Sequence, residues 1–379
     1  MVQESRQGGI TLKRLIHLVS GICLVIVIFL PGQAAAAPGV SAAHAVLMEQ
    51  STGRVLFEKD AHEPQRIASI TKIMTAIIAI ESGELEDMAT ASRRAVYTEG
   101  SSIYLEEGEK MKLKDLVYGL MLRSGNDSAV AIAEKVGGSV EGFVHMMNEK
   151  AAWLGMTDTT FENPHGLDSE NHRSSAYDMA LLMRYAMDND IFKEITGAKS
   201  YKAETRTYAW GNKNKLLTQY YEYCTGGKTG YTKKAGRTLV STAERDGMSL
   251  IMVTINDPDD WRDHMRLFDW GFENYQMTDL QERGVEQFNI RGTNKELSGY
   301  FPENLQYPLT HKEQQQVTSS AYFLHSALEA DSQPETIGKK VFNVNGNYLT
   351  EMTIRKSDSG HDTGRYGFWQ LFQKMTGVF

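Results

Sequence analysis

The chain has 379 residues, of which 41% are hydrophobic and 23% charged, so it can bury a large core and has the composition of a globular protein. Its formal net charge is −8. Residues 1–36 contribute +2, from three basic residues and one acidic residue, so the remainder carries −10. This acidic balance argues against nucleic acid as a partner, since binding phosphates requires clustered cations.

Residues 1–36 have the pattern of a secretory signal peptide. A basic stretch ends at Arg14, an apolar run follows over 15–30, and alanines occupy positions 34–37. The apolar run is shorter than the ~20 residues that a membrane-spanning helix needs, which disfavours a retained anchor. We therefore predict cleavage near Ala36 and export from the cytoplasm. Outside the cytoplasm there is no ATP supply, which disfavours kinases and synthetases.

The next residues predict strands, then helices, then strands again. A hairpin is expected over 44–58, with its turn at residues 51–53. Apolar residues at helical spacing predict helices over 70–78, 113–122, 128–136, 143–154 and 177–187.

β-rich runs return over 237–243 and 248–255, separated by an Arg-Asp-Gly turn, and a helix is expected over 261–275. That helix should pack on the sheet through Trp261, Met265, Phe268 and Phe272. The order predicts an α+β catalytic domain over 37–275: one antiparallel sheet built from both ends of the domain, with a helical lobe inserted between them.

The C-terminal part has a different texture. Short apolar runs and the Asn345-Gly346 turn signal predict a small β-rich, sandwich-like domain over 280–355. Residues 364–379 form an amphipathic segment with several aromatic residues on one helical face. Two interpretations stay open for this segment: a peripheral membrane anchor, or a helix docked on its own domain.

Three short patterns occur in a fixed order: Ser69-Ile70-Thr71-Lys72, Ser124-Gly125-Asn126 and Lys228-Thr229-Gly230, at spacings of 55 and 104 residues. The first two patterns arise by chance in many chains, and Ser169-Glu170-Asn171 also fits the second. We prefer Ser124, because it lies between two predicted helices, whereas Ser169 lies in a long polar loop. The specificity comes from the order and context of all three patterns.

Ser69 begins a strongly apolar helix, and Lys72 lies one turn further along the same face. A serine hydroxyl becomes a good nucleophile only when a neighbouring base removes its proton. Burial or a nearby cation can keep a lysine neutral and therefore basic. The sequence predicts Ser69 as the nucleophile and Lys72 as its base.

The other two patterns supply the remaining roles. Ser124 is expected to pass a proton to the leaving amine, and Asn126 to bond the substrate amide. Lys228 and Thr229 suit a carboxylate, and the following Gly230 leaves room for a substrate chain to pair with the strand edge. The amide of Tyr231 is expected to complete an oxyanion hole with that of Ser69.

With these residues the chain resembles the serine-type D-alanyl-D-alanine carboxypeptidases, which are low-molecular-mass penicillin-binding proteins, and among them the sporulation-associated members of spore-forming Gram-positive bacteria. The resemblance is strong over about 40–275 and weak beyond. The stretches that carry it are 66–75 (RIASITKIMT), 122–127 (LRSGND), 163–168 (NPHGLD) and 226–232 (GGKTGYT).

The resemblance implies the penicilloyl-serine-transferase fold, with a C-terminal β-sandwich and an amphipathic anchor. It implies removal of the terminal D-Ala from peptidoglycan stem peptides through acyl-Ser69, inhibition by β-lactams, and a role in cell-wall or spore-cortex maturation. The location implied is the outer face of the cytoplasmic membrane, the wall or the forespore envelope. Asp178 lies in a family segment near the cleft and is a further candidate. Cys224 stands where a small hydroxylated residue is expected.

Two rival functions remain at this point. A class A β-lactamase needs a deacylating glutamate in a Glu-x-x-Leu-Asn setting, which the segment 161–166 lacks. A non-catalytic wall-binding or β-lactam-sensing protein would need a signalling partner or a spanning helix. No metal or cofactor is implied, because His165 and His172 lack partners at ligand spacing and are interpreted as structural.

Overall fold

The computed structural model describes residues 37–290, 296–328 and 334–357. The predicted signal peptide and the amphipathic segment 364–379 lie outside the described residues. Residues from Pro38 onward cluster into one compact unit.

A five-stranded antiparallel sheet forms the centre of the first part of this unit, in the order β2-β1-β9-β8-β7. Strand β1 pairs with β9 over its whole length, from His44 opposite Ile255 to Glu49 opposite Leu250. Both ends of the predicted domain therefore meet in one sheet, which confirms the expected α+β fold. The strands are β1 (His44–Glu49), β2 (Val55–Lys59), β7 (Cys224–Thr232), β8 (Gly236–Arg245) and β9 (Met248–Ile255).

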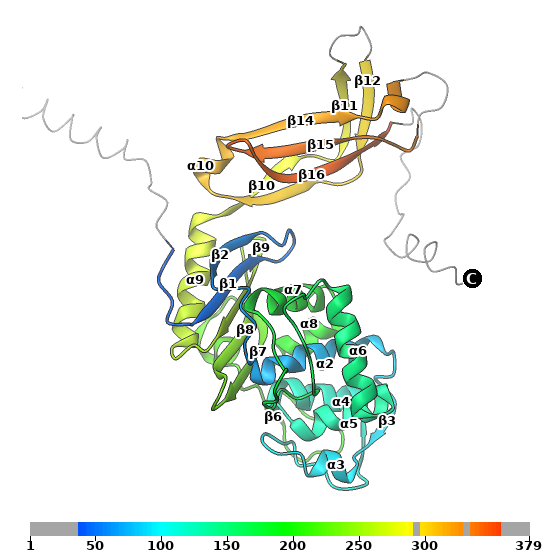
Figure 1. The fold of residues 1–379 in the computed structure, drawn as a ribbon, viewed down its shortest axis with the longest axis vertical. Helices are drawn as coiled ribbons and strands as arrows, with labels where there is room; N and C mark the ends of the chain where they lie inside the picture. The colour runs from blue at the N-terminus through cyan, green and yellow to red at the C-terminus, as the bar shows by residue number, and fades with distance from the viewer. Residues whose placement is uncertain (1–36, 291–295, 329–333, 358–379) are drawn as a thin grey trace, which may run out of the picture. The chain divides into compact units, whose positions relative to one another are not determined.

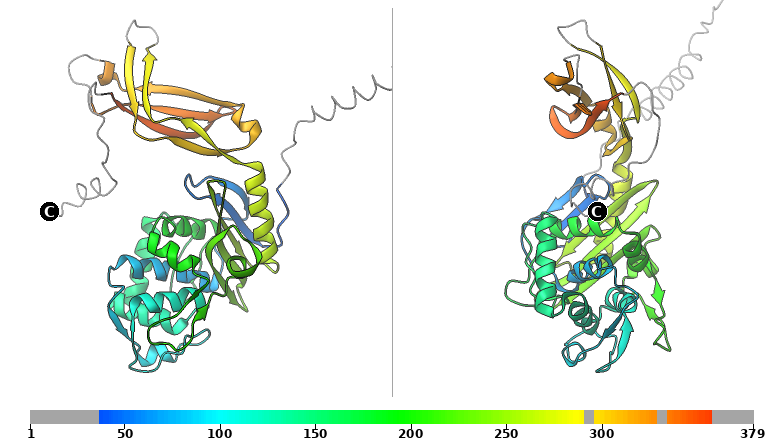
Figure 2. Two further views of the ribbon diagram at one scale, coloured as in Figure 1. Left: turned by 180° about the vertical axis from the view of Figure 1, so that it is seen from behind. Right: turned by 90° about the vertical axis from the view of Figure 1, so that its right-hand side faces the viewer.

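Strands β1, β8 and β9 carry buried apolar residues on both faces, because both faces are covered. On β1, Val46 and Met48 join the core under the helical lobe, whereas Ala45 and Leu47 join a second core. Helix α9 (Asp260–Asn274) covers that second face and places Phe268 in its centre, as predicted. Figures 1 and 2 show α9 and the helical lobe on opposite sides of the sheet.

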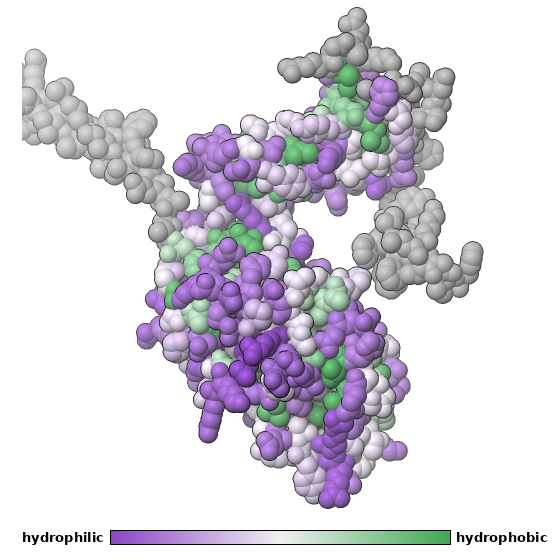
Figure 3. Space-filling view, viewed as in Figure 1, coloured by the Kyte–Doolittle hydropathy of each residue, from purple (hydrophilic) through white to green (hydrophobic). Residues whose placement is uncertain are grey.

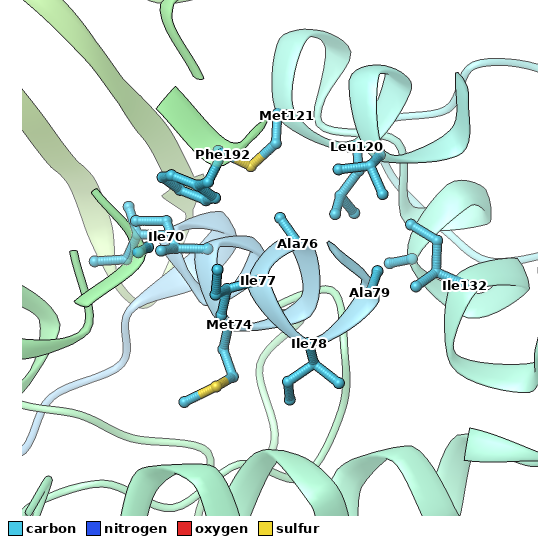
Figure 4. Close-up of a cluster of buried hydrophobic side chains, with 14 of the residues drawn as sticks. Ile70, Met74, Ala76, Ile77, Ile78, Ala79, Leu120, Met121, Ile132 and Phe192 are labelled. Atoms are coloured by element: carbon cyan, nitrogen blue, oxygen red, sulfur yellow. The ribbon is translucent and has the colours of Figure 1, made fainter. Parts of the chain in front are cut away.

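Helix α2 (Lys72–Glu81) runs through the middle of the helical lobe, and Ser82 follows it at the C-cap. Its residues from Lys72 to Ile80 are all buried, and all of them except Lys72 and Thr75 are apolar, as expected for a core helix. Figure 4 shows its side chains directed outward to residues of the surrounding helices, including Leu120, Ile132 and Phe192. The surrounding helices are α4 (Leu113–Tyr118), α5 (Asn126–Gly137), α6 (Val140–Trp153), α7 (Ala176–Ala186) and α8 (Asp190–Gly197).

Several short elements were not predicted from the sequence. They are too short to show a hydrophobic period, and local side chains define them instead: Asn189 caps α8 by accepting from the amides of Ile191 and Phe192. The others are the helix α3 (Arg93–Val96), the π-helical turn Leu216–Tyr220, and the strand pairs β3 (Met88–Thr90) with β4 (Lys110–Lys112) and β5 (Ser200–Tyr201) with β6 (Trp210–Gly211). The helix predicted over 113–122 is present as α4 and continues as the π-helical turn Gly119–Arg123.

The C-terminal part is β-rich, as expected, and has a separate apolar core that includes Phe301, Ile337 and Ile354. The turn at Asn345-Gly346 has positive φ at both residues, 53° and 80°, and joins two paired strands. One sheet has the order β11-β12-β16-β15-β14, and β10 pairs with β13. The elements are β10 (Gln276–Gln281), β11 (Gly284–Asn289), β12 (Glu296–Phe301), β13 (Leu305–Leu309), α10 (His311–Gln314), β14 (Val317–Phe323), β15 (Thr336–Val344) and β16 (Asn347–Lys356).

The surface is largely polar on the face drawn in Figure 3, where apolar residues form small groups between hydrophilic ones. Within the ranges that the structure describes, no helix has the length and apolar content needed to cross a bilayer.

Candidate active site

Ser69 lies in a 3-10 turn, Ala68–Thr71, that leads directly into α2. The turn starts from an unusual backbone conformation, because Ala68 has a φ of 50°. Strand β8 holds the turn against the sheet, since the Thr238 hydroxyl donates to the carbonyl of Ile67 at 2.9 Å. The half-buried Ser69 side chain therefore stands at the head of a buried helix and beside the sheet.

Lys72 is fully buried and points back toward Ser69, with 2.9 Å between its Nζ and Ser69 Oγ. Nζ also donates to Asn126 Oδ1 at 2.7 Å and to the carbonyl of His165 at 2.5 Å. A neutral amine has two hydrogens and one lone pair, and these two acceptors take both hydrogens. The lone pair is then directed at the Ser69 hydroxyl, which is the arrangement that a general base requires.

Electrostatics favours the neutral form of Lys72. Burial, followed by the positive charges of Lys228 and Lys213, holds the pKa of Lys72 well below its ordinary value. The opposing effect of the Asp127 carboxylate is smaller than these.

Asn126 orients the lysine. Its Nδ2 donates to the carbonyl of Glu99 at 2.5 Å, which leaves Oδ1 to face Lys72. Ser124 reaches the same site because its φ of 64° turns the chain sharply between the π-helical turn and α5. The expected corner between two helices therefore exists, and it directs short polar side chains inward.

Lys228 enters from β7 and is also buried, at 2% exposure. Its Nζ donates to Ser124 Oγ at 3.1 Å and to the carbonyl of Thr229 at 2.7 Å. Burial, and then the charge of Lys213, lowers the pKa of Lys228 to about 7. A negatively charged ligand would favour its protonated form, so this lysine suits a carboxylate.

Strand β7 passes directly beside the nucleophile. A Cβ placed on Gly230 would lie 2.9 Å from the Ser69 nitrogen and 2.3 Å from Thr238 Oγ1. Only glycine therefore allows the strand this close to the Ser69 amide. Tyr231, the next residue, keeps its side chain 66% exposed.

The structure brings five predicted residues into one group: Ser69, Lys72, Ser124, Asn126 and Lys228. Asp178 belongs to a different set of contacts. Its carboxylate accepts from the Asp158 amide at 2.8 Å and from the Thr159 hydroxyl at 2.7 Å, and so anchors the turn before the loop that ends at His172.

Two contributions to the site carried no signal in the sequence. The His165 group that contacts Lys72 is a backbone carbonyl, which any residue could supply. Lys213 lies outside every motif, yet its charge lowers the pKa of both Lys72 and Lys228. Among the residues that the structure describes, no group of three or more potential ligands could hold a metal ion.

A family model described as D-alanyl-D-alanine carboxypeptidase, peptidase S11, matches residues 32–259. The chain is 37% identical over 249 residues to D-alanyl-D-alanine carboxypeptidase DacF of Bacillus subtilis, covering 63% of this chain and 64% of DacF. It is 36% identical over 258 residues to D-alanyl-D-alanine carboxypeptidase DacC of Escherichia coli, covering 64% of each. The match thus spans slightly less than two thirds of these relatives.

The fold is similar to that of a solved penicillin binding protein. Penicillin binding protein 5 from Haemophilus influenzae aligns with a TM-score of 0.73 and 27% identity, over 86% of this chain and 99% of that one.

Proposed function

Because the chain belongs to the D-alanyl-D-alanine carboxypeptidase family of serine peptidases, we propose that it releases the terminal D-alanine from peptidoglycan stem peptides through an acyl-Ser69 intermediate. The observation that carries the proposal is the contact between Ser69 Oγ and the buried, oriented amine of Lys72. β-Lactams, which resemble the acyl-D-Ala-D-Ala end, are proposed to acylate the same hydroxyl.

Acylation proceeds as follows in this proposal. Ser69 Oγ attacks the carbonyl of the penultimate D-Ala while Lys72 Nζ takes its proton. The amides of Ser69 and Tyr231 bind the oxyanion of the tetrahedral intermediate. When the C–N bond breaks, the proton passes through Ser124 Oγ to the nitrogen of the departing D-Ala, whose carboxylate is held by Lys228 and Thr229.

Water then attacks the ester, which releases the shortened peptide and restores the Ser69 hydroxyl. This step is expected to be slow with β-lactams, in contrast to a β-lactamase. Glu162 is the carboxylate in the corresponding segment, but it accepts from the Asn171 amide at 3.0 Å. The nearby Ser169 hydroxyl and the hydrogen bonds from Asn171 hold the pKa of Glu162 below its usual range, which makes it a poor base.

The location of the enzyme is also a proposal, supported by the sequence pattern. Residues 1–36 would direct its export to the outer face of the cytoplasmic membrane or the wall and then be removed. Residues 37–275 would form the catalytic domain and 280–355 a small β domain, with 364–379 in peripheral contact with the membrane. The resemblance to sporulation-associated members favours a role in the spore cortex and a place in the forespore envelope.

Release of D-Ala from a peptide ending in D-Ala-D-Ala tests the activity. The Ser69→Ala variant should lose this activity by several orders of magnitude, as expected for a covalent nucleophile. Ser169→Ala, in the second Ser-x-Asn sequence, is the matched control and should retain it. Mass spectrometry should find one stable penicilloyl adduct, on Ser69. Full activity of Ser69→Ala, or rapid continuous penicillin hydrolysis, would disprove the proposal.

A further inference from the structure

A buried chain of hydrogen bonds leads from the 162–172 segment to the backbone just before Ser69. The Glu162 amide donates to His172 Nδ1 at 3.0 Å. Because Nδ1 accepts, the ring hydrogen resides on Nε2, which donates to Thr71 Oγ1 at 2.8 Å. The Thr71 hydroxyl in turn donates to the carbonyl of Ala68 at 2.8 Å. The hydrogen bonds therefore all run in the same direction, from the Glu162 amide through His172 and Thr71 to the Ala68 carbonyl.

The surroundings keep this arrangement in place. His172 is 2% exposed and Thr71 is completely buried. Burial lowers the pKa of His172 to about 4, so the ring is neutral near pH 7 and can accept at Nδ1 while it donates at Nε2. A charged imidazole would present a hydrogen to the Glu162 amide and break the chain.

The chain of hydrogen bonds ends on the peptide unit that carries the Ser69 amide. This unit is planar, and its carbonyl and N–H point in opposite directions. A bond that fixes the Ala68 carbonyl therefore also fixes the direction of the Ser69 N–H. That nitrogen lies beside β7, where a Cβ on Gly230 would come within 2.9 Å of it.

The same peptide unit is strained and closely enclosed. Ala68 has a φ of 50°, a conformation that residues with a Cβ rarely adopt and that persists only when the surroundings hold it. The loop backbone at Gly166 also lies close to this carbonyl: a Cβ there would come within 2.0 Å of the Ala68 oxygen and 2.9 Å of Thr71 Oγ1. The Thr71 hydroxyl thus donates to the Ala68 carbonyl at a place where the surrounding backbone leaves little free space.

We propose that His172 and Thr71 are positioning residues that orient the Ser69 amide toward the oxyanion and strengthen it as a donor. The strengthening follows because aligned hydrogen bonds polarise one another. This inference rests on the proposed function, in which neither side chain touches the substrate. Loss of these hydrogen bonds should slow acylation of Ser69 about 10-fold. Removal of an oxyanion donor itself slows catalysis more, by about 10²–10³-fold.

The test compares two pairs of variants. Thr71→Val and His172→Phe remove the hydrogen bonds and keep the shape, and Thr71→Ser retains the hydroxyl. The structure offers a matched control pair, because Thr254 Oγ1 and His264 Nε2 form the same buried contact at 3.0 Å on the α9 side of the sheet. Thr254→Val and His264→Phe therefore report the general effect of losing such a pair.

Two measurements distinguish positioning from a general loss of structure. The first is the rate of Ser69 acylation by penicillin, together with kcat and KM for D-Ala release. The second is the infrared carbonyl frequency of the penicilloyl ester, which rises when the oxyanion donors weaken. Thr71→Val and His172→Phe should slow acylation about 10-fold, leave KM nearly unchanged and raise the carbonyl frequency, while Thr71→Ser and the controls match the wild type.

Wild-type acylation rate and carbonyl frequency in folded Thr71→Val or His172→Phe would overturn the inference. Equal slowing in Thr254→Val would do the same. Failure of the wild type itself to form acyl-Ser69 would instead refute the proposed function, so the two failures are distinguishable. If one test variant does not fold, the other decides.

Discussion

Replacement of Lys228 by methionine is expected to abolish activity and yet stabilise the protein. The Lys228 ammonium is buried, and its hydrogen-bond acceptors are the neutral Ser124 Oγ and Thr229 carbonyl. Burial, and then the charge of Lys213, lowers the pKa of Lys228 from 10.5 to about 7. The folded protein therefore bears a free-energy cost for this charge that the unfolded chain does not.

The size of that cost follows from the pKa difference. Each pKa unit corresponds to about 1.36 kcal/mol, so the protonated lysine disfavours the folded state by about 5 kcal/mol. Replacing Lys228 removes this cost but also removes its two hydrogen bonds, which lowers the stability by about 2–3 kcal/mol. We expect Lys228→Met to raise the free energy of unfolding by about 2 kcal/mol below pH 7, equivalent to about 4–8 °C in Tm.

The effect has a definite pH dependence. Between about pH 7 and 10.5 the unfolded wild-type chain binds more protons at Lys228 than the folded protein does, so wild-type stability rises with pH in this window. The stabilisation by Lys228→Met should therefore be full below about pH 7 and fall as the pH rises toward 10.5, where the cost of the charge is gone and only the loss of the two hydrogen bonds remains.

Urea unfolding of the wild type and the variant, at about pH 6 and about pH 10, measures the effect. Lys135→Met is the control, since Lys135 is paired with Glu84 and Asp87 at the surface and should show no such gain. A variant that is no more stable than the wild type at the lower pH, or a gain that is the same at both, would refute the reasoning.

Two further outcomes are expected. Gly166→Ala places a Cβ 2.0 Å from the Ala68 oxygen, so it should lower both Tm and the acylation rate. Gly83→Ala, with positive φ but nothing within 4 Å, should cost only about 1 kcal/mol of backbone strain, and equal Tm losses would contradict this. Burial raises the pKa of Cys224 from 9.0 to about 11. Near pH 8, iodoacetamide should therefore modify Cys224 about 100-fold more slowly in the native protein than in urea, because the reactive thiolate is rarer. Mass spectrometry follows the modification, and comparable rates in the two conditions would contradict the buried thiol.

Long periodic elements were predictable because their patterns are local. The apolar run after Ser69 specifies a core helix, and the two β runs around Asp246-Gly247 specify a hairpin whose turn has positive φ at both residues. Short elements such as α8 were not predictable, since four to eight residues cannot show a period and depend on a cap or on neighbouring chain.

The sequence by itself determined which side chains could carry the chemistry: a serine and a lysine one helical turn apart, and the order of the three motifs. Only the tertiary structure decided how they meet. The neutral state of Lys72 depends on its complete burial, and its orientation depends on Asn126 and a carbonyl from position 165. These are properties of enclosure and of backbone direction, which arise when residues about 55 and 90 positions apart pack together and which no local pattern of side chains encodes.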